Sequence, residues 1–185
     1  KLFVSANNIT GERNTLFSVV RYGNVSKSRG SIIPLLKDQL INSKYFTITH
    51  KDMTRFWITL SQGVNFTLES IDLMRGGEIF IPKIPSIKIL NIAEALDAQK
   101  KIKFIGIRPG EKKHELLISR DDNLGAIEFK KYFILKPMIN INRPNIKYSI
   151  SKNSENGKLV NESFEYNSYT NKNYLSFALI KKLLN

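Results

Sequence analysis

Residues 17–25, with the sequence FSVVRYGNV, join a compact apolar run to a Gly-Asn pair. Aliphatic and aromatic residues bounded by such a turn predict a buried strand over residues 17–22. The loop of residues 28–31 carries an arginine, and helical spacing follows over residues 32–40. A strand that leads through a turn into a helix is typical of α/β sheets, whose ligands bind beyond the carboxyl ends of strands. Gly23 is expected to let a ligand approach the backbone closely.

The same patterns predict the other elements of the chain. Strands are expected at residues 46–49, 78–81, 102–107 and 132–135. Helices are expected at residues 60–74, 89–96, 109–117 and 175–184, and residues 2–6 are expected to end a helix. Residues 136–172 are predicted to be rich in loops. The alternation of strands and helices indicates an α/β fold with mixed or parallel pairing.

The composition excludes several classes of function. The 185 residues hold 29 Lys plus Arg and 16 Asp plus Glu, a formal net charge of +13 that is spread along the chain. A spread excess suits an anionic ligand or a solvated surface, whereas nucleic-acid binding is expected to need a basic stripe or patch. Cysteine is absent, which excludes disulfides and thiolate metal sites, and two histidines exclude a His-rich metal site. No apolar run is long enough for a membrane helix.

Three segments combine residue types that suit an anionic ligand. In the first, Asn24 offers an amide and Arg29 a planar guanidinium for phosphate oxygens, although an ordinary surface loop would have the same composition. In the second, Arg55 lies between apolar residues beside the single tryptophan, Trp57. A partly desolvated guanidinium needs an anionic or hydrogen-bonding partner, which is either a ligand or a carboxylate such as Asp52.

The third segment runs from Arg108 to Glu111 after a predicted strand. Pro109 suits a first helical position, so Arg108 is expected beside a helix N-terminus, where an anion is favoured. Glu111 could then accept hydrogen bonds from a vicinal diol, or it could simply cap the helix while Arg108 is solvated. His50 and His114 are expected to be surface or packing histidines. Together, the three segments offer cations for a diphosphate and a carboxylate for a ribose.

Several segments closely resemble one protein family. They are residues 1–8, 17–25, 28–34, 53–59, 77–85, 106–115 and 164–166, and the pair MTRFWI (53–58) with RPGEK (108–112) is highly specific. The family is that of the NADP-dependent UDP-N-acetylglucosamine 4,6-dehydratases (inverting), which are extended short-chain dehydrogenase/reductase proteins of bacterial surface polysaccharide and flagellin glycan biosynthesis. The resemblance covers nearly the whole chain.

The resemblance implies roles for individual residues. A UDP-sugar would be bound through these substrate-binding residues: Asn24, Arg29, Ile48, Arg55, Arg108 and Glu111. Of these, Glu111 would bind the uridine ribose, and Ile48 would line the uracil site through its backbone. Tyr22 and Val25 would lie near the nicotinamide of the NADP cofactor. The resemblance also implies a cytoplasmic enzyme that forms homo-oligomers.

The sequence departs from the family pattern in ways that affect activity. The glycine-rich dinucleotide fingerprint and the catalytic residues are absent, so none of the residues present is predicted to be catalytic, and the chain alone is expected to be inactive and poorly soluble. Lys27 stands where the family usually has Gly, and His50 stands where an Asp is usual. A non-catalytic remnant of a split reading frame remains the alternative, and a basic nucleic-acid-binding protein is a further one.

The expected fold is therefore the C-terminal portion of a Rossmann-type (extended short-chain dehydrogenase/reductase) fold plus a small α/β substrate-binding lobe. Residues 1–30 and 60–85 would form the last elements of the nucleotide-binding fold. Residues 31–59 and 86–136 would form the substrate-binding lobe, and residues 137–185 a C-terminal extension.

Overall fold

The computed structural model describes residues 2–11, 13–26, 28, 30–139 and 145–184. The chain divides into two compact units, each made of three separate stretches of sequence. Unit 1 comprises Lys1–Tyr22, Ser61–Lys83 and Leu117–Tyr166, and unit 2 comprises Gly23–Leu60, Ile84–Leu116 and Asn167–Asn185. Both units contain helices together with parallel and antiparallel strands, so the predicted α/β class is confirmed.

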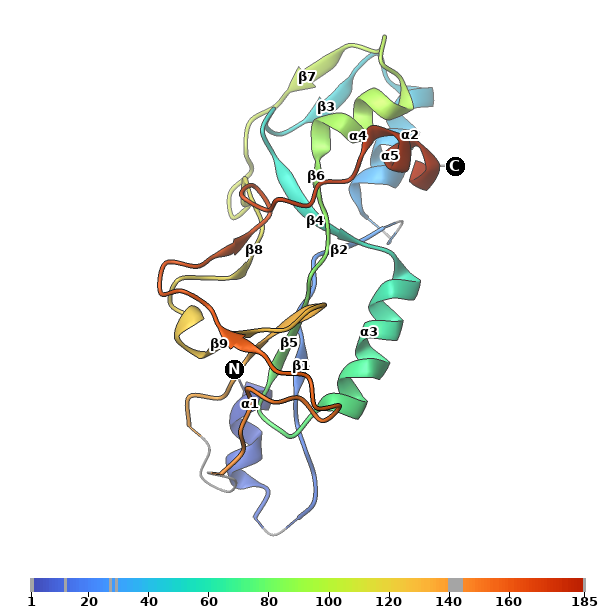
Figure 1. Ribbon diagram of the computed structural model, residues 1–185. Helices are drawn as coiled ribbons and strands as arrows, with labels where there is room; N and C mark the ends of the chain where they lie inside the picture. Colours follow the sequence, from blue (N-terminus) through green and yellow to red (C-terminus); the bar gives the residue numbers. More distant parts are fainter. Residues whose placement is uncertain (1, 12, 27, 29, 140–144, 185) are drawn as a thin grey trace. The chain divides into compact units, whose positions relative to one another are not determined.

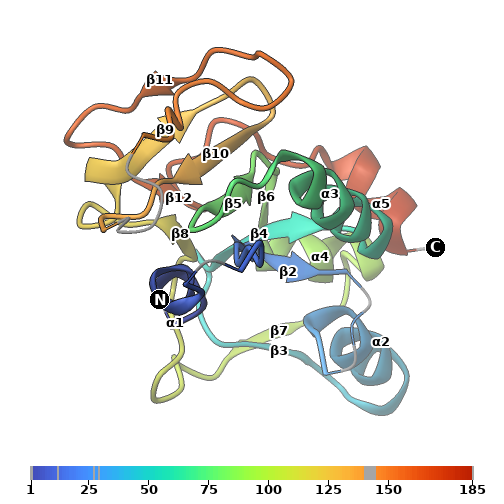
Figure 2. The same ribbon diagram turned by 90° about the horizontal axis from the view of Figure 1, so that it is seen from below.

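Unit 1 contains a five-stranded sheet in the order β1-β5-β10-β9-β11. Its strands are β1 (Val19–Val20), β5 (Ile79–Pro82), β10 (Tyr132–Leu135), β9 (Ala126–Glu128) and β11 (Lys158–Leu159). β1 pairs with β5 in parallel. β10 pairs with β5 and β9 in antiparallel fashion (Figure 2). The predicted strand at residues 17–22 is shorter and only half-buried, although the Arg21 N–H still donates to the Phe80 carbonyl.

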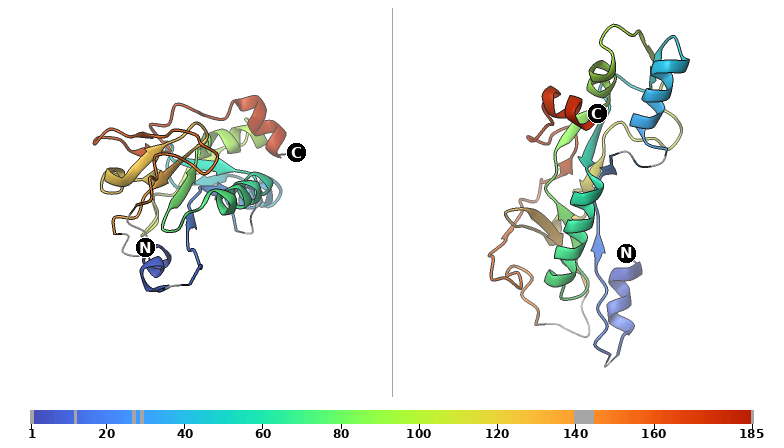
Figure 3. Two further views of the ribbon diagram at one scale, coloured as in Figure 1. Left: turned by 60° about the horizontal axis from the view of Figure 1, so that its bottom comes forward. Right: turned by 90° about the vertical axis from the view of Figure 1, so that its right-hand side faces the viewer.

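Unit 1 contains α1 (Leu2–Ala6), the 3₁₀ helix η1 (Asn7–Ile9) and α3, which spans Leu60–Leu73 (Figure 3). The Asn7 amide holds α1 to the segment before β1, because it donates to the Phe17 carbonyl at 2.8 Å and accepts from the Phe17 N–H at 3.0 Å. On α3, Phe66 and Leu73 pack against the core. The apolar stripe Val64, Leu68 and Ile71 is about half exposed.

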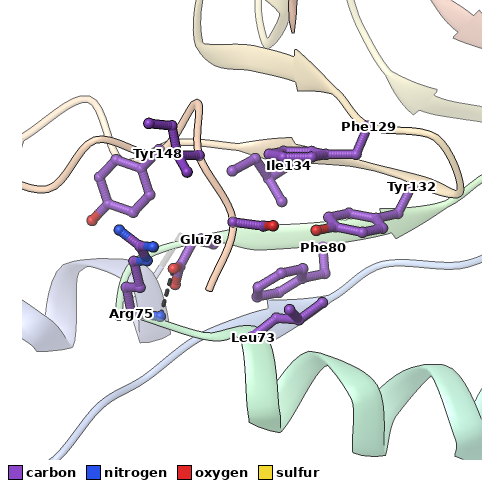
Figure 4. A pocket seen from close by; sticks show the side chains of 10 residues that line it. Leu73, Arg75, Glu78, Phe80, Phe129, Tyr132, Ile134 and Tyr148 are labelled. Carbon is purple, nitrogen blue, oxygen red and sulfur yellow. Dashed lines mark hydrogen bonds between the residues drawn. The ribbon is translucent and has the colours of Figure 1, made fainter. Parts of the chain in front are cut away.

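The core of unit 1 is aromatic. Phe129 and Tyr132 stack with their ring centroids 4.8 Å apart, and Phe80 and Tyr148 belong to the same cluster. Beside it, Glu78 closes the turn between α3 and β5. Its buried carboxylate accepts hydrogen bonds from the Gly76 N–H, from the Ser18 hydroxyl and from the Arg75 N–H, the last of which is drawn in Figure 4. The turn needs glycine, since φ is +101° at Gly76 and +90° at Gly77.

Unit 2 contains two small sheets. The first has the order β2-β4-β6, in which β2 (Asn24–Val25) runs parallel to β4 (Thr54–Ile58) and β6 (Ser86–Lys88) runs antiparallel to it. The second pairs β3 (Phe46–Ile48) with β7 (Ile102–Phe104) in parallel (Figure 1). β4 is the central strand of the first sheet, and four of its five residues are buried.

Three helices pack together in unit 2 (Figure 1). They are α2 (Ile32–Asn42), α4 (Ile89–Leu96) and α5 (Phe177–Leu184). Ile33 and Leu36 of α2, Ile92 of α4 and Ile180 of α5 are nearly or fully buried in one cluster with Trp57 of β4. The helices predicted at residues 32–40, 89–96 and 175–184 are therefore confirmed, with α2 two residues longer and α5 two residues shorter at the start.

The other short elements are β8 (Leu116–Ile118), η2 (Asn123–Gly125) and β12 (Tyr166–Asn167), and β8 and β12 form a two-stranded sheet. The helix predicted at residues 109–117 is wrong. Gly110 has φ of +78°, the Glu111 N–H closes a turn onto the Arg108 carbonyl, and the chain then runs extended into β8. The backbone of residues 113–115 bonds to β4 and to Ser168 instead of to its own next turn.

The unit boundaries follow the compactness of the chain and do not assign a function to either unit. The predicted division into nucleotide-binding elements, a substrate-binding lobe and a C-terminal extension therefore stays a prediction.

Candidate functional site

A cavity of about 200 Å³ lies in unit 2. It brings together residues that are far apart in the sequence. Five of the six predicted substrate-binding residues line it, namely Asn24, Ile48, Arg55, Arg108 and Glu111. The sixth, Arg29, lies outside the described residues, as does Lys27.

Backbone carbonyls accept hydrogen bonds from the Arg55 guanidinium and orient it. It lies on β4 with 12% of its side chain exposed, and its Nη1 donates to the Thr54 carbonyl at 2.8 Å and to the Lys113 carbonyl at 3.1 Å. Its Nε lies 3.9 Å from the Glu115 carboxylate. Burial lowers the pKa of Arg55, and the carboxylates of Glu115 and Glu111 oppose that shift. An arginine remains protonated under such conditions, so this wall of the cavity is cationic.

The carboxylate suggested as a partner for Arg55 is engaged elsewhere. Asp52 forms an ion pair with Lys113, with 3.3 Å between Nζ and Oδ2. His50 also faces this carboxylate, and its Nδ1 accepts a hydrogen bond from the Asp52 N–H. His50 therefore closes its own turn.

Arg108 and Glu111 are brought together by a turn and not by a helix. The Arg108 N–H donates to Glu111 Oε2 at 3.2 Å, and the Glu111 N–H donates back to the Arg108 carbonyl at 2.9 Å. The predicted helix N-terminus is therefore absent at this place, and so is its dipole. The Arg108 side chain is exposed, and the second Glu111 oxygen lies 3.5 Å from the Thr49 hydroxyl.

Asn24 and Ile48 enter the cavity from two different sheets. Asn24 begins β2, is exposed, and stands opposite Trp57 of β4 in the parallel register. Ile48 ends β3 with its side chain buried, and its carbonyl accepts a hydrogen bond from the Ile105 N–H. The lining at Ile48 is therefore apolar, with its carbonyl already engaged.

The two residues predicted to lie near a nicotinamide do not line this cavity. Tyr22 belongs to unit 1, where its ring faces Gly63, and Val25 belongs to unit 2, where it pairs with Ile58. The structure gives a further reason for glycine at position 23. A Cβ at this position would lie 2.6 Å from the Phe56 carbonyl oxygen, so close packing against β4 by itself requires the glycine, and the approach of a ligand stays a prediction.

A buried polar network beneath Arg55 was not anticipated from the sequence. Thr54 Oγ1 lies 2.8 Å from His114 Nδ1 and 2.7 Å from Ser168 Oγ, and neither hydroxyl residue is exposed. The His114 ring packs on Tyr169 with centroids 4.5 Å apart, which agrees with a packing histidine. Burial lowers the pKa of His114, and the nearby charges of Lys113 and Arg55 lower it further.

Two polar atoms of the cavity lining are unusual. Among the described residues, the Ser31 hydroxyl and the Trp57 indole N–H are buried without a hydrogen-bond partner. Both residues line the cavity around Arg55. Buried polar groups rarely lack a hydrogen-bond partner, and each group that lacks one lowers the stability of the folded state.

A hollow in unit 1 is much smaller. It is lined by Arg75, Glu78 and Tyr148 and has about 10 Å³, room for a single water molecule, and Figure 4 shows its aromatic lining. The described residues contain no group of three or more His, Asp or Glu side chains placed to hold a metal ion. They also contain no helix with the length and apolar character needed to cross a membrane.

Comparison with known proteins relates this arrangement to nucleotide-sugar enzymes. The chain is 47% identical over its whole length to the UDP-N-acetylglucosamine 4,6-dehydratase (inverting) of Campylobacter jejuni, strain 81-176, and covers 56% of that protein. It is 36% identical to the UDP-glucose 4-epimerase of Rickettsia canadensis and covers 53% of it. The chain thus spans about half the length of these curated relatives.

A solved structure and a family model extend the comparison. The X-ray structure of Pen from Bacillus thuringiensis matches 99% of this chain and 53% of its own, with a TM-score of 0.76 and 31% identity. This likeness agrees with the predicted C-terminal portion of a Rossmann-type fold. The model of the family described as polysaccharide biosynthesis protein matches residues 1–137. Because that match spans well over half of the sequence, the chain belongs to this family of polysaccharide biosynthesis proteins.

Proposed function

We propose that unit 2 binds the UDP part of a UDP-sugar, and that the chain is the substrate-binding part of a nucleotide-sugar dehydratase of surface polysaccharide biosynthesis. One observation carries the proposal. Four residues from three separate sequence motifs, together with Ile48, which the resemblance implies, line a single cavity within one unit. An ordinary set of surface loops has no reason to converge in this way.

The chemistry of the lining suits a nucleoside diphosphate. Arg55 and Arg108 offer guanidinium groups that bind phosphate oxygens in planar, charge-assisted pairs. The Glu111 carboxylate can accept hydrogen bonds from ribose hydroxyls, and the Asn24 amide can donate to a phosphate. The apolar side at Ile48 is suited to a flat base.

The names of the relatives support a UDP-sugar as substrate, because both the dehydratase and the epimerase are named for one. We propose UDP-N-acetylglucosamine, after the relative with 47% identity, with inversion at C5. A role in flagellin glycosylation is a narrower part of the same proposal.

A nicotinamide dinucleotide, which we propose to be NADP, would supply the redox chemistry of the complete reaction when bound. The described residues assigned to it fit poorly as a site by themselves. Tyr22 and Val25 offer an aromatic ring and a strand end, with neither a cation for its phosphates nor a carboxylate for its ribose. We therefore predict that this chain alone does not dehydrate UDP-N-acetylglucosamine.

Calorimetric titration with UDP tests the proposal. The wild-type chain is expected to bind saturably, and Arg55→Ala and Arg108→Ala are each expected to weaken binding about tenfold or more, as for the loss of a charge-assisted hydrogen bond. Arg120→Ala is the matched control, because Arg120 is 73% exposed and pairs with Glu165 in unit 1. Equal affinity in all four proteins would refute the assignment of these arginines.

Two other outcomes would favour the alternatives. Binding to DNA that is unsaturable and falls steeply with salt would indicate a basic nucleic-acid-binding protein. A folded chain that binds neither UDP nor DNA would indicate a non-catalytic remnant.

A further inference from the structure

The acceptors of Arg55 belong to two segments that a buried network ties together. The Nη1 group donates to the carbonyls of Thr54 and Lys113, and the Thr54 N–H donates to the same Lys113 carbonyl at 3.2 Å. The position of the guanidinium therefore depends on how β4 lies against residues 113–115.

Side-chain hydroxyls hold β4 in place against residues 113–115. Thr54 Oγ1 bonds to His114 Nδ1 on one side and to Ser168 Oγ on the other. Ser168 in turn accepts from the Glu115 N–H at 2.8 Å and donates its own N–H to the Glu115 carbonyl at 2.8 Å. Thr54 and Ser168 are fully buried, so water does not compete for these bonds.

The direction of each hydrogen bond between Ser168, Thr54 and His114 follows from counting donors and acceptors. The Glu115 N–H occupies Ser168 Oγ as an acceptor, so the Ser168 hydroxyl can donate to Thr54, and Thr54 can donate to His114 Nδ1. The Ser168 and Thr54 protons then both have acceptors, with Nδ1 unprotonated. Thr54 also bonds to the Tyr174 hydroxyl, whose own proton goes to the Ser168 or Tyr169 carbonyl. A Thr54 hydroxyl that donated to Tyr174 would instead leave Nδ1 protonated, and the tautomer of His114 distinguishes the two arrangements. The reverse order would leave the Ser168 proton without an acceptor among the described contacts.

We infer that Thr54, Ser168 and neutral His114 act together as positioning residues for Arg55, so that protonation of His114 weakens the binding of the nucleotide diphosphate. The inference rests on the proposed UDP-sugar function of the same cavity. An imidazolium would reverse the hydrogen-bond order, so that the Ser168 hydroxyl proton loses its acceptor and β4 is held less firmly against residues 113–115. The positive charge alone would attract the diphosphate, so the predicted weakening comes from the lost positioning of Arg55. The other titratable groups that face His114 are Asp52, His50 and Tyr169, and Asp52 is the one whose charge favours the imidazolium.

Titration with UDP-N-acetylglucosamine at pH 7.5 and 5.5 tests this inference, because its doubly esterified diphosphate does not titrate in that range. Thr54→Val and Ser168→Ala are expected to weaken binding about three- to tenfold at pH 7.5, the effect of one buried hydrogen bond. Thr54→Ser, which keeps the hydroxyl, is expected to recover most of the affinity. His114→Asn offers an acceptor that does not titrate, so its affinity should fall less than that of the wild type when the pH is lowered from 7.5 to 5.5 and below.

Thr67→Val is the matched control, because the Thr67 hydroxyl bonds within α3 of unit 1, to the Gly63 carbonyl. It should behave as the wild type. Unchanged affinity in both Thr54→Val and Ser168→Ala would overturn the inference, and so would equal pH dependence in His114→Asn and the wild type.

Nuclear magnetic resonance separates this inference from the proposed function. Imidazole nitrogen shifts should show His114 in the neutral Nε2–H tautomer at pH 7.5, and an Nδ1–H tautomer or an imidazolium would refute the proton order. If the wild-type chain binds no UDP-sugar, the proposed function fails, and the Nε–H signal of Arg55 decides the positioning role. Thr54→Val and Ser168→Ala must shift that signal, whereas Thr67→Val must leave it in place.

Discussion

Replacing Gly23 by alanine separates packing from ligand approach as the reason for glycine at this position. The added Cβ would lie 2.6 Å from the Phe56 carbonyl oxygen and nearer still to the Phe56 Cβ, so the backbone of β2 or β4 must move. Overpacking of this kind costs about 1–3 kcal/mol. Removing the flexibility of glycine from the unfolded chain returns about 0.4–1 kcal/mol, because φ at Gly23 is not positive. The expected net loss is about 1–2 kcal/mol.

Urea denaturation followed by the fluorescence of Trp57 measures this loss directly, because Trp57 is the single tryptophan and is buried in unit 2 next to Phe56. Gly63→Ala is the matched control. It lies inside α3, where a Cβ would meet only the Tyr22 ring at 3.8 Å, so a gain of up to about 1 kcal/mol is expected by circular dichroism. A Gly23→Ala protein that is as stable as the wild type but binds UDP more weakly would refute the packing argument.

Three further outcomes are expected. Glu78→Gln should destabilise the chain by about 2–4 kcal/mol in urea denaturation, since its carboxylate accepts three hydrogen bonds in a buried site; Glu128→Gln, on an ion pair that is half exposed, should cost under about 1 kcal/mol. The pKa of His114 is lowered in the folded chain, so the unfolded chain takes up the proton first as the pH falls. The free energy of unfolding should therefore be constant well above pH ~6.5 and decrease as the pH drops from there towards the folded pKa. The melting temperature should follow this decrease, and His114→Asn should lessen it. Leu68→Glu, which places a charge in the exposed stripe of α3, should raise the concentration at which the chain precipitates, and an unchanged solubility limit would contradict that reading of the stripe.

The site motifs were accessible from the sequence because their residue types are chemically distinctive. An arginine in an apolar strand and an Arg-Pro-Gly-Glu turn are uncommon combinations, and both line the cavity around Arg55. Each motif can be recognised by its own residues, so the long stretches of sequence between the motifs did not prevent their prediction as site residues.

The conformation of residues 109–117 was not accessible in the same way. Pro109 is compatible with both a helix start and a turn, and local spacing favoured the helix. The structure resolves the choice through long-range partners, since the Lys113 carbonyl accepts from the Thr54 N–H and the Glu115 backbone bonds to Ser168. These partners lie about 50 or more residues away, beyond what a local pattern can indicate.

The groups that orient Arg55 could not be predicted from the sequence either, because they are backbone acceptors. Arg55 is oriented by the carbonyls of Thr54 and Lys113, and a carbonyl is present at every residue, so no side-chain pattern marks the ones that matter. The hydroxyl network was missed for a related reason. In the sequence, Thr54 resembles an ordinary strand residue and Ser168 resembles part of a polar loop. Only the folded structure shows that both are buried.

The discontinuous make-up of unit 2 has a consequence for how the chain is synthesised. Ile180 and Leu184 complete a core that otherwise comes from residues 33–93, and Ser168 belongs to the network beneath Arg55. During translation, α2 and α4 must therefore leave the ribosome long before α5 can cover them. The partly built core is exposed throughout that interval, when chaperones and aggregation compete for it. Ribosome stalling or late frameshifts should thus remove the cavity together with the core, although none of the cavity's predicted ligand residues lies in the last stretch of the chain.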